Sequence, residues 1–499
     1  MGMRAKNKLN GKEVSNKNRR VNRKGVQIES DCLNKTIIIR RGTTMNKYAK
    51  LLTLGLTVFC AQGAAYAAVA QSEAAKLGGE LTPTGADPKA NQDGSIPAWT
   101  GSQAKAPSGF QKGAKPIDPF VGEKPLFSIN ASNAAQYQAK LSPGQKELLK
   151  LHQGYRMDVY PSHRSCPLPA SVAAQTRKNA TDAKLAADGW GLAQVQGGGF
   201  PFPIPQNGAE AIWNFKLRYQ GESMHNSYVG MLPPKGASGK NLGVVQQFYD
   251  DILFPLGKPD ADLTSSKGME LYFSSFTTAP AAVAGEGTLA HYYIAKPNDL
   301  WLYFASQRRV RRAPTYQYDA PVLQSDNLLA VDQVWMYNGP VDRYDFKLVG
   351  KQELIVPYNN VPLYDHTVAA QDVHDPLFMA RDKVRYESHR VWVVEANVKP
   401  GMRHSFPKRT FYLDEDSWLI VAEDLYDAQG KIWRSMEAYT VANWDLGACV
   451  QAGYASYDLQ VGRYLSDRVV AGSGKAPVYG VSLNTSDFSV ESFRSNAGR

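Results

Sequence analysis

Cysteines are few in this sequence, and the apolar run near its start is short. Four cysteines occur among 499 residues, and no two of them form a C-x-x-C pair. A zinc ribbon or a thioredoxin-type redox centre is therefore excluded. The apolar run from Leu51 to Phe59 is too short to form a stable membrane-spanning helix, so it is not a membrane anchor.

Motifs of the common hydrolases and nucleotide-binding proteins are also missing. The eight histidines include no H-x-x-x-H or H-E-x-x-H spacing, and no G-x-S-x-G elbow is present. GASGKN at 236–241 lacks the spacing of a phosphate loop, and the glycines at 197–199 precede prolines rather than a helix start. We therefore expect no metal, no cofactor and no catalytic residues of these types.

Positive charge is concentrated at the start of the chain. The formal net charge is +11, but residues 1–44 hold 12 Lys and Arg against 3 Asp and Glu, and residues 45–67 add two Lys and no acid. Residues 68–499 are left with 43 basic and 43 acidic residues. If residues 68–499 carried a nucleic-acid-binding face, they would normally hold more basic than acidic residues. We therefore expect no nucleic-acid partner.

Residues 45–67, MNKYAKLLTLGLTVFCAQGAAYA, have the layout of a secretory signal. Two Lys come first, an apolar run follows, and Ala65-Tyr66-Ala67 forms an A-x-A cleavage site. We therefore expect a signal peptide cleaved near Ala67 and a mature protein in the periplasm. Residues 1–44 are then expected to be an upstream, non-native extension.

Two cysteines remain after the signal, Cys166 and Cys449. Two thiols in an oxidising compartment usually pair, so we expect a disulfide between them. Chain-entropy arguments value a bridge over so long a loop at about 5 kcal/mol. The alternative is two buried, unpaired thiols.

Amino-acid composition divides the rest of the chain into an arm and one β-rich domain. Residues 68–125 are rich in Gly, Pro, Thr and Asp, which predicts an extended N-terminal arm. Residues 126–499 form the domain, with helical lid segments predicted from the cap Ser142, over 170–186 and from the cap Asn207. Aromatic and β-branched runs between turn residues predict antiparallel strands, for example in 271–279, 299–314, 389–398 and 411–433.

The predicted strands carry apolar residues on both faces. In 389–398, Trp392 and Val394 share one face while Val391 lies on the other, and 418–426 repeats the pattern. An antiparallel sheet buried on both faces is covered by helices or curls around an apolar lumen. We therefore predict an α+β, mainly antiparallel fold built on one large curved sheet.

The stretch 411–433, FYLDEDSWLIVAEDLYDAQGKIW, is rich in acids. A calcium loop of the helix–loop–helix type needs a central Gly and flanking helices, and Asp414-Glu415-Asp416 has neither. The acids fall at strand boundaries, and residues 427–430 read as a turn ending in Gly, so turn chemistry is the simplest interpretation. A hydrolase that uses Asp414 or Asp416 is the alternative.

The densest group of histidines lies in a loop-like region. It contains Asp365, His366, Asp372, His374 and Asp375. The group is either a metal site or a set of polar loop residues that hydrogen-bond locally, and the second interpretation is favoured.

One conspicuous basic cluster is formed by Arg308, Arg309, Arg311 and Arg312. Such a cluster can hold an anionic lipid head group or lie on a membrane surface. The alternative is pairing with acids on neighbouring strands or with solvent, which is the commoner fate of a charge run.

The aromatic residues are the strongest indication of a binding site in the sequence. Most of them belong in an ordinary core, but a cavity for an apolar ligand draws on the same residue types. The two-faced strands favour some of them as cavity-lining residues, and the candidates are Trp213, Trp301, Tyr303, Trp335, Trp392, Trp418 and Trp433.

Long strings of the chain resemble a proteobacterial periplasmic family, domain of unknown function 1329. They include GGELTPTGADPKANQDGSIPAWTG, FPFPIPQNGAEAIWN, WLYFASQRRVRRAPTYQYDAP, YNGPVDRYDFKLVGKQELIVPYNN and RTFYLDEDSWLIVAEDLYDAQGKIWR. The family is often labelled outer-membrane lipoprotein-sorting-like, which implies a half-barrel like that of lipoprotein carriers, with helices across its concave face. Family members are often encoded beside transporters of the resistance–nodulation–division type. No catalytic residues are described for the family, so none are carried over.

We therefore expect a non-enzymatic periplasmic carrier or accessory factor for a lipid-like ligand, working with an envelope transporter. The two-faced strands and the aromatic content motivate this expectation. One alternative is an Asp/Glu-dependent hydrolase. Another is a structural partner that docks a transporter or an outer-membrane barrel through the arm at 68–125.

Overall fold

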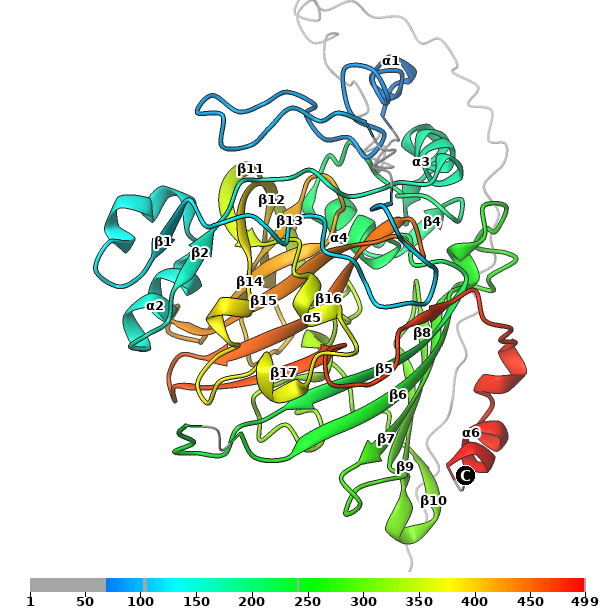
Figure 1. Ribbon diagram of the computed structural model, residues 1–499. Helices are drawn as coiled ribbons and strands as arrows, with labels where there is room; N and C mark the ends of the chain where they lie inside the picture. Colours follow the sequence, from blue (N-terminus) through cyan, green and yellow to red (C-terminus); the bar gives the residue numbers. More distant parts are fainter. Residues whose placement is uncertain (1–68, 102–105, 240–241, 498–499) are drawn as a thin grey trace, which may run out of the picture. The chain divides into compact units, whose positions relative to one another are not determined.

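The computed structural model describes residues 69–101, 106–239 and 242–497, which Figure 1 draws in colour. The predicted signal peptide at 45–67 and the predicted extension at 1–44 lie outside the described residues. Within these ranges no helix has both the length and the apolar character that crossing a membrane requires.

One large sheet dominates the described residues, and it is open because β1 and β10 stand at its two ends. Its strands from β5 to β10 follow one another, as do those from β12 to β17, and β17 pairs with β5. The pairs are antiparallel except β2 with β12. The strands are β1 (Phe127–Ile129), β2 (Met157–Val159), β5 (Ser223–Met231), β6 (Val245–Leu253), β7 (Met269–Ala279), β8 (Gly287–Tyr293), β9 (Asp299–Phe304), β10 (Arg309–Arg312), β11 (Tyr344–Pro357), β12 (Tyr386–Val398), β13 (Lys408–Asp414), β14 (Ile420–Tyr426), β15 (Ile432–Asn443), β16 (Ala448–Asp458), β17 (Arg463–Val469) and β18 (Val478–Tyr479). The predicted fold, mainly antiparallel with one large curved sheet, is confirmed (Figure 1).

The helices are short, and two of them begin where their capping residues predict. Ser142 accepts a hydrogen bond from the Gln145 backbone N–H, and the Gln145 side chain accepts one from the Ser142 backbone N–H. Asn207 accepts from the backbone N–H of Glu210. Each cap satisfies donors that the first helical turn leaves free. The helices are α1 (Gln71–Ala74), α2 (Pro143–Leu151), α3 (Ala170–Asp182), α4 (Gly208–Lys216), α5 (Val361–Tyr364) and α6 (Val490–Asn496).

The helix predicted over 170–186 ends earlier, at Asp182. Lys184 and Leu185 form the short strand β3 (Lys184–Leu185), which pairs with β4 (Leu192–Gln194). A backbone that leaves the helix to pair with β4 cannot continue the helical hydrogen bonds, so the hairpin fixes the helix end.

Both faces of the sheet are covered, as the two-faced strands predict. In β15, Met436 and Ala438 belong to the core that contains Trp213 of α4. Tyr439 and Val441, which point to the opposite face, belong to the core that contains residues of α2 and α5. Successive side chains of a strand point to opposite faces, so α4 covers one face and α2 and α5 cover the other. Helices therefore lie on both faces of the sheet.

Arg308 and Trp418 lie outside the strands predicted for them, and Trp335 also lies outside any strand. The run 299–314 is a hairpin of β9 and β10, and Arg308 occupies its turn in a left-handed conformation (φ 50°). Trp418 lies in the β13–β14 turn (φ 59°), and Trp335 lies in the segment between β10 and β11 (φ 55°). Positive φ is rare for large side chains, which is why periodicity alone did not place these residues.

The described part of the predicted arm, 69–101 and 106–125, contains one short helix, α1, and otherwise turns. It is not separate from the rest of the chain. Ala74, Leu77, Thr84, Ala86 and Ile96 are buried, each with at most 5% of its surface exposed. The arm is therefore packed against the sheet-bearing part of the chain.

Candidate ligand-binding cavity

A cavity of about 150 Å³ lies over one face of β5 to β9 and β17. Its second wall is the irregular segment 316–338. Its aromatic side chains are those of Tyr228, Phe248, Phe273, Tyr292, Tyr316 and Trp335. Tyr303 borders the cavity, but its ring lies on the opposite face of the sheet and packs edge-on against Phe493. Larger hollows of about 400 and 540 Å³ lie beside the arm. Their walls are made partly from irregular parts of the arm, within 93–101 and 106–120, whereas the cavity over β5 to β9 has a continuous sheet as one wall.

The alternation of β7 shows how the sequence builds this wall. Phe273 and Thr277 line the cavity. Tyr272 and Phe276 point to the opposite face, where the Phe276 ring stacks at 5.1 Å on Phe493 of α6. Alternate residues of a strand face opposite sides, so one face of β7 serves the cavity and the other packs on the C-terminal helix.

The covering segment 316–338 is bound to its surroundings by many polar contacts. The Gln324 side chain donates to Glu286 Oε2 at 2.7 Å, and the Asn338 side chain donates to the Tyr292 hydroxyl at 2.7 Å. The buried Asp332 carboxylate accepts from the Arg409 guanidinium at 2.7 Å. Because many of its residues adopt left-handed backbone conformations, the segment turns repeatedly and forms one short 3-10 helix, Val331–Gln333. The residues in left-handed conformations are Tyr318, Gln324, Asp326, Asn327, Trp335 and Met336.

A buried ionic group lies at the polar end of the cavity. The Arg468 guanidinium donates to Asp467 Oδ2 at 2.8 Å and to Asp250 Oδ2 at 3.2 Å. The hydroxyl of Tyr454 donates to Asp467 at 2.6 Å, and that of Tyr228 donates to Asp250 at 3.2 Å. Burial raises the pKa of Asp250 to about 6, although Arg468 opposes this shift. The group therefore holds more acid than base.

Trp335 stands where three cavities meet. It lines the cavity over β5 to β9, a second one of about 60 Å³ that reaches Tyr479, and a third of about 20 Å³ that reaches Glu270. The Arg468 guanidinium lies 4.4 Å from the centroid of the Trp335 ring and also borders the second cavity. Trp335 and Arg468 together form the partition between the first two cavities.

The structure places the seven candidate aromatic residues in different environments. Trp335 lines the cavity, whereas the ring of Tyr303 packs edge-on against Phe493 on the opposite face of the sheet. Trp392 and Trp418 stack on each other at 6.0 Å, and Trp433 packs on Phe406. Trp213 is buried in α4 and Trp301 packs edge-on against His291. Ligand binding by these residues stays a prediction, and of the seven only Trp335 has its side chain at the cavity.

Several cavity residues were not singled out in the sequence. Tyr228, Phe248, Phe273 and Tyr292 lie on four consecutive strands, and Arg468 comes from β17. The sequence pattern that could have identified them is an aromatic residue on the cavity-facing side of each successive strand. No sequence pattern could predict that Arg468 of β17 reaches the cavity, because β17 pairs with β5, which is far away in sequence.

The four arginines at 308–312 lie at the exposed hairpin of β9 and β10. Arg312 pairs with Asp299, and Arg311 donates to the Gln307 side chain at 2.7 Å. Pairing with an acid on the neighbouring strand is thus observed for Arg312. Head-group binding by Arg308, Arg309, Arg311 and Arg312 stays a prediction.

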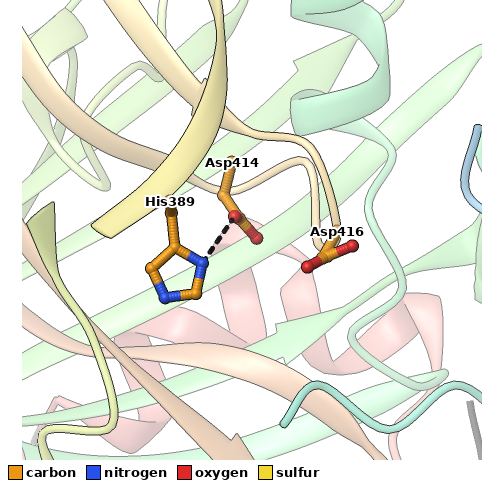
Figure 2. Close-up of side chains that lie close together, drawn as sticks. All are labelled: His389, Asp414 and Asp416. Carbon is orange, nitrogen blue, oxygen red and sulfur yellow. Dashed lines mark ion pairs between the residues drawn. The ribbon is translucent and has the colours of Figure 1, made fainter. Parts of the chain in front are cut away.

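The acidic turn of the sequence forms a second cluster with His389, which Figure 2 shows. His389, Asp414 and Asp416 offer ligand atoms within 4.8 Å of one another, the one such group of cation-binding residue types among the described residues. His389 Nδ1 and Asp414 Oδ1 are 3.8 Å apart. Asp416 is bound by the Arg164 guanidinium at 2.6 and 2.8 Å.

Charge in this cluster is balanced by side chains of the protein. Burial opposes a charge on His389, but its hydrogen bond to Glu387 at 3.1 Å and the nearby Asp414 raise its pKa. Burial and repulsion from Asp416 raise the pKa of Asp414 to about 6. A protonated His389 between two acids supplies the positive charge that a cation would bring, so the geometry favours an ion-pair network over a metal centre.

The comparisons with known proteins agree with the family predicted from the sequence. The sequence model for "Protein of unknown function (DUF1329)" matches residues 128–494. The chain belongs to this family. The uncharacterized protein PA3922 of Pseudomonas aeruginosa is 39% identical to it over 437 residues, which cover 87% of this chain and 95% of that protein.

Two solved structures resemble this DUF1329 protein at low identity. One is a candidate outer membrane lipoprotein-sorting protein domain of Vibrio parahaemolyticus, with a TM-score of 0.40, 14% identity and coverage of 57% of this chain and 97% of that one. The other is a DUF1329 family protein of Desulfovibrio piger, with a TM-score of 0.38, 15% identity and coverage of 55% and 92%. At these scores the similarity carries no argument about function, which rests on the chain's own residues.

The acidic turn of the DUF1329 chain anchors the arm. Trp418 Nε1 donates to the backbone oxygen of Thr84 at 2.9 Å. Arg164 and Arg390 both donate to the backbone oxygen of Asp87, at 2.9 and 2.8 Å. Arg390 also donates to Glu415 at 2.6 Å, so the turn acids hold the two guanidinium groups in place. The turn therefore has a structural task.

Arg390→Ala is expected to loosen the arm. The change removes two hydrogen bonds from a charged donor to the arm backbone, at Asp87 and Lys89. Losing charged hydrogen bonds of this kind lowers the free energy of local opening by about 2 kcal/mol. Trypsin cleavage after Lys89 should therefore become faster. Lys351→Ala is the matched control, because Lys351 also binds Glu415 but makes no such contact to the arm. Equal cleavage rates in both variants would contradict this role of Arg390.

The disulfide predicted for the DUF1329 chain is confirmed. Cys166 and Cys449 are bonded, and their Cα atoms lie 5.1 Å apart. The bridge joins the irregular segment before α3 to β16 and lies beside the Tyr358 hydroxyl, 2.8 Å from Cys166 Sγ. The disulfide thus attaches to β16 the segment that carries Arg164, whose guanidinium binds Asp416 and the arm backbone at Asp87.

The loop group around His374 does not gather into a cation site. The ring of His374 is buried, with Nδ1 2.6 Å from the Ala370 backbone oxygen and Nε2 2.7 Å from Ser466 Oγ. Burial lowers its pKa to about 4. Asp365 accepts from the backbone and the hydroxyl of Thr367. These local hydrogen bonds agree with the polar-loop interpretation.

Proposed function

We propose that this DUF1329 protein is a non-enzymatic carrier or accessory factor that shelters an apolar, lipid-like ligand in the cavity over β5 to β9. The observation that carries the proposal is the set of six aromatic side chains that line one cavity, between a continuous sheet and an irregular cover. Ligand sites are typically concave and mostly apolar, with a few polar groups at fixed places. The cavity with Arg468 at one end has this composition.

The size of the cavity implies that its cover moves when a long ligand binds. A volume of about 150 Å³ accepts a molecule the size of benzene. A lipid chain needs more room, and the partly exposed stretch 322–324 of the covering segment is the part of the wall that a ligand can displace, because the opposite wall is a hydrogen-bonded sheet. Leu323 lies at the cavity and is 46% exposed, which places an apolar side chain where a ligand enters.

The hydrolase alternative has less support from the geometry. Asp416 is bound at both oxygens by Arg164, and Asp414 Oδ2 accepts from Ser417 and Tyr358. Neither aspartate lines any of the five cavities described above. A general acid must reach the atom that it protonates, so a carrier fits these positions better.

The disulfide supports a location outside the cytoplasm. Disulfides form and persist in oxidising compartments, and Cys166 and Cys449 are bonded. The proposal therefore places the carrier in the periplasm, as the signal sequence predicts. A partner in the envelope, such as a transporter of the resistance–nodulation–division type, stays a prediction.

Thr288→Trp is expected to weaken binding of an apolar probe about tenfold or more. Thr288 lines the cavity on β8 and is only half-buried, so the indole fills ligand space without a large change in the core. The measurement is a titration with the neutral fluorescent probe N-phenyl-1-naphthylamine, supported by native mass spectrometry with added lipids.

Thr278→Trp is the matched control for this experiment. Thr278 lies on β7, is exposed, and differs in parity from the cavity-lining Phe273 and Thr277. The same substitution there adds an indole to the other face of the sheet. Unchanged probe binding in both variants, or no binding by the parent protein, would count against the proposed function.

A further inference from the structure

The charge beside the cavity is unequal. The carboxylates of Glu286 and Asp467 line it together with one guanidinium, that of Arg468. Behind Arg468 lies a third carboxylate, Asp250, which is 0% exposed and 3.2 Å from the guanidinium. When all these groups are ionised, the polar end carries more negative than positive charge.

This surplus acts against an anionic ligand. An anion placed at Arg468 would also lie beside Asp467, whose Oδ2 is 2.8 Å from the same guanidinium. Inside a protein, charges at such distances interact more strongly than in water, because the surroundings screen them less. Arg468 already pairs with Asp467 and Asp250. A negatively charged ligand group beside it would therefore gain little attraction from Arg468 and would be repelled by the two carboxylates.

Arg468 nevertheless has a donor left over. Its side chain is 8% exposed, and its Nε atom has no hydrogen-bond partner among the described residues. A buried N–H without an acceptor costs free energy, and an acceptor supplied by a ligand removes that cost. Arg468 lines the main cavity and borders the second one, but its Nε atom is itself buried, so a ligand acceptor reaches it only when the partition formed with Trp335 opens.

A cationic ligand fits no better than an anionic one. The faces of Trp335 and Tyr228 are the aromatic surfaces beside the acids, and the Arg468 guanidinium occupies both, at 4.4 and 4.7 Å from the ring centroids. A second cation would have to compete with Arg468 for these rings.

We propose that the ligand is an uncharged amphiphile with an acceptor oxygen, such as an alcohol or an ester, which accepts a hydrogen bond from Arg468 Nε while its apolar part lies among the aromatic side chains of β5 to β8. The inference rests on the proposed function and adds the class of ligand. A fatty acid, whose head group is ionised at neutral pH, is rejected by the same site.

Three probes with the same sixteen-carbon chain test this selectivity: monopalmitoylglycerol, palmitate and hexadecyltrimethylammonium. Each displaces N-phenyl-1-naphthylamine from the parent protein, below its micelle-forming concentration, at pH 8 where Asp250 is ionised. The neutral probe should bind about tenfold more tightly than either charged probe.

Removing one carboxylate should change this order in a defined way. Asp467→Asn should strengthen palmitate binding about fivefold or more, with little effect on monopalmitoylglycerol. Because Asp467 is itself hydrogen-bonded to Arg468 and Tyr454, Glu286→Gln provides a second variant at a half-buried position, where the new amide oxygen can still accept from Gln324. Glu491→Gln, at an exposed position of α6, is the matched control and should leave all three affinities unchanged.

The outcomes separate the inference from the proposed function. Palmitate or the ammonium probe binding as tightly as the neutral probe, with binding abolished by Thr288→Trp, would overturn the uncharged ligand and leave the carrier standing. Affinities that neither Thr288→Trp nor the carboxylate variants change would overturn both. Selective neutral binding that Asp467→Asn or Glu286→Gln relaxes toward palmitate supports both.

Discussion

Replacing Cys166 and Cys449 together with alanine is expected to lower the free energy of unfolding by about 5 kcal/mol. The disulfide joins residues that are 283 apart in sequence. A cross-link over so long a loop removes many conformations from the unfolded chain, and that restriction disappears in the variant. A loss of this size is a large fraction of the stability of an ordinary domain.

The measurement is chemical unfolding of the oxidised parent protein and the double variant, each with and without a reductant. Reductant should lower the midpoint of the parent and leave the variant unchanged. The reduced parent is the control for side-chain truncation, because it keeps both sulfur atoms but lacks the bond. Coinciding midpoints for oxidised and reduced parent protein would show that the bridge does not stabilise the fold.

Asp424→Asn is expected to raise the free energy of unfolding above pH 7, by up to about 3 kcal/mol. Asp424 is 0% exposed. Its oxygens accept from the hydroxyls of Ser142, Ser435 and Tyr412, at 3.2 to 3.3 Å, and none of these partners is a cation. Burial without a cation raises the pKa of Asp424 to about 6, and the hydrogen bonds only partly oppose the shift. An amide has nearly the same shape and no charge to bury.

The sign of the pH dependence follows from the raised pKa. The unfolded carboxyl has its ordinary pKa near 3.8, whereas the folded one has a pKa of about 6. Between these values the folded state binds more protons, so stability from this group is present below pH 3.8 and is lost as the pH rises through about 6. The variant lacks this loss, and the two proteins should therefore diverge between pH 4 and pH 7.

Unfolding midpoints measured at pH 4.5, 6 and 8 test this expectation. Asp372→Asn is the control, because Asp372 is exposed and the same change should leave the pH profile as it is. A parallel shift of the Asp424→Asn profile at all three pH values would contradict a charge effect. It would point instead to altered packing around α2 and β15.

The sequence was most informative where local chemistry decides the structure. Ser142 and Asn207 marked helix starts because their side chains satisfy backbone donors a few residues away. The two apolar faces of 389–398 predicted a sheet covered on both sides, as β12 shows. Cys166 and Cys449 needed only their compartment and their number to be paired.

The acidic turn shows where local reasoning stopped. Asp414, Glu415 and Asp416 were interpreted as turn residues, and they do lie at the β13–β14 turn. Their burial and their pairing with Arg164 and Arg390 depend on segments more than twenty residues away in sequence. Composition could not reveal that the same acids position the guanidinium groups that hold the arm.

The cavity could not be predicted from the sequence, for a related reason. Aromatic residues are common in cores, and only the pairing order of β5 to β9 decides which of them share an open space. Trp335 reaches the cavity through a left-handed backbone conformation that no periodic pattern predicts. Arg468 arrives from β17, at an irregular point of its pairing with β5.

The join between β17 and β5 also bears on how fast the chain folds. Strands β5 to β10 and strands β12 to β17 are two meanders of neighbouring segments, whereas the join pairs Val229 with Val469 and Met231 with Ser466. Pairings between such distant residues form slowly, because a large loop must close first. A chain that emerges from its N-terminus can complete the first meander early, but it has to wait for the last strand before the sheet is whole. Since Arg468 lies in that join and lines the cavity, the cavity is complete only at the end of folding.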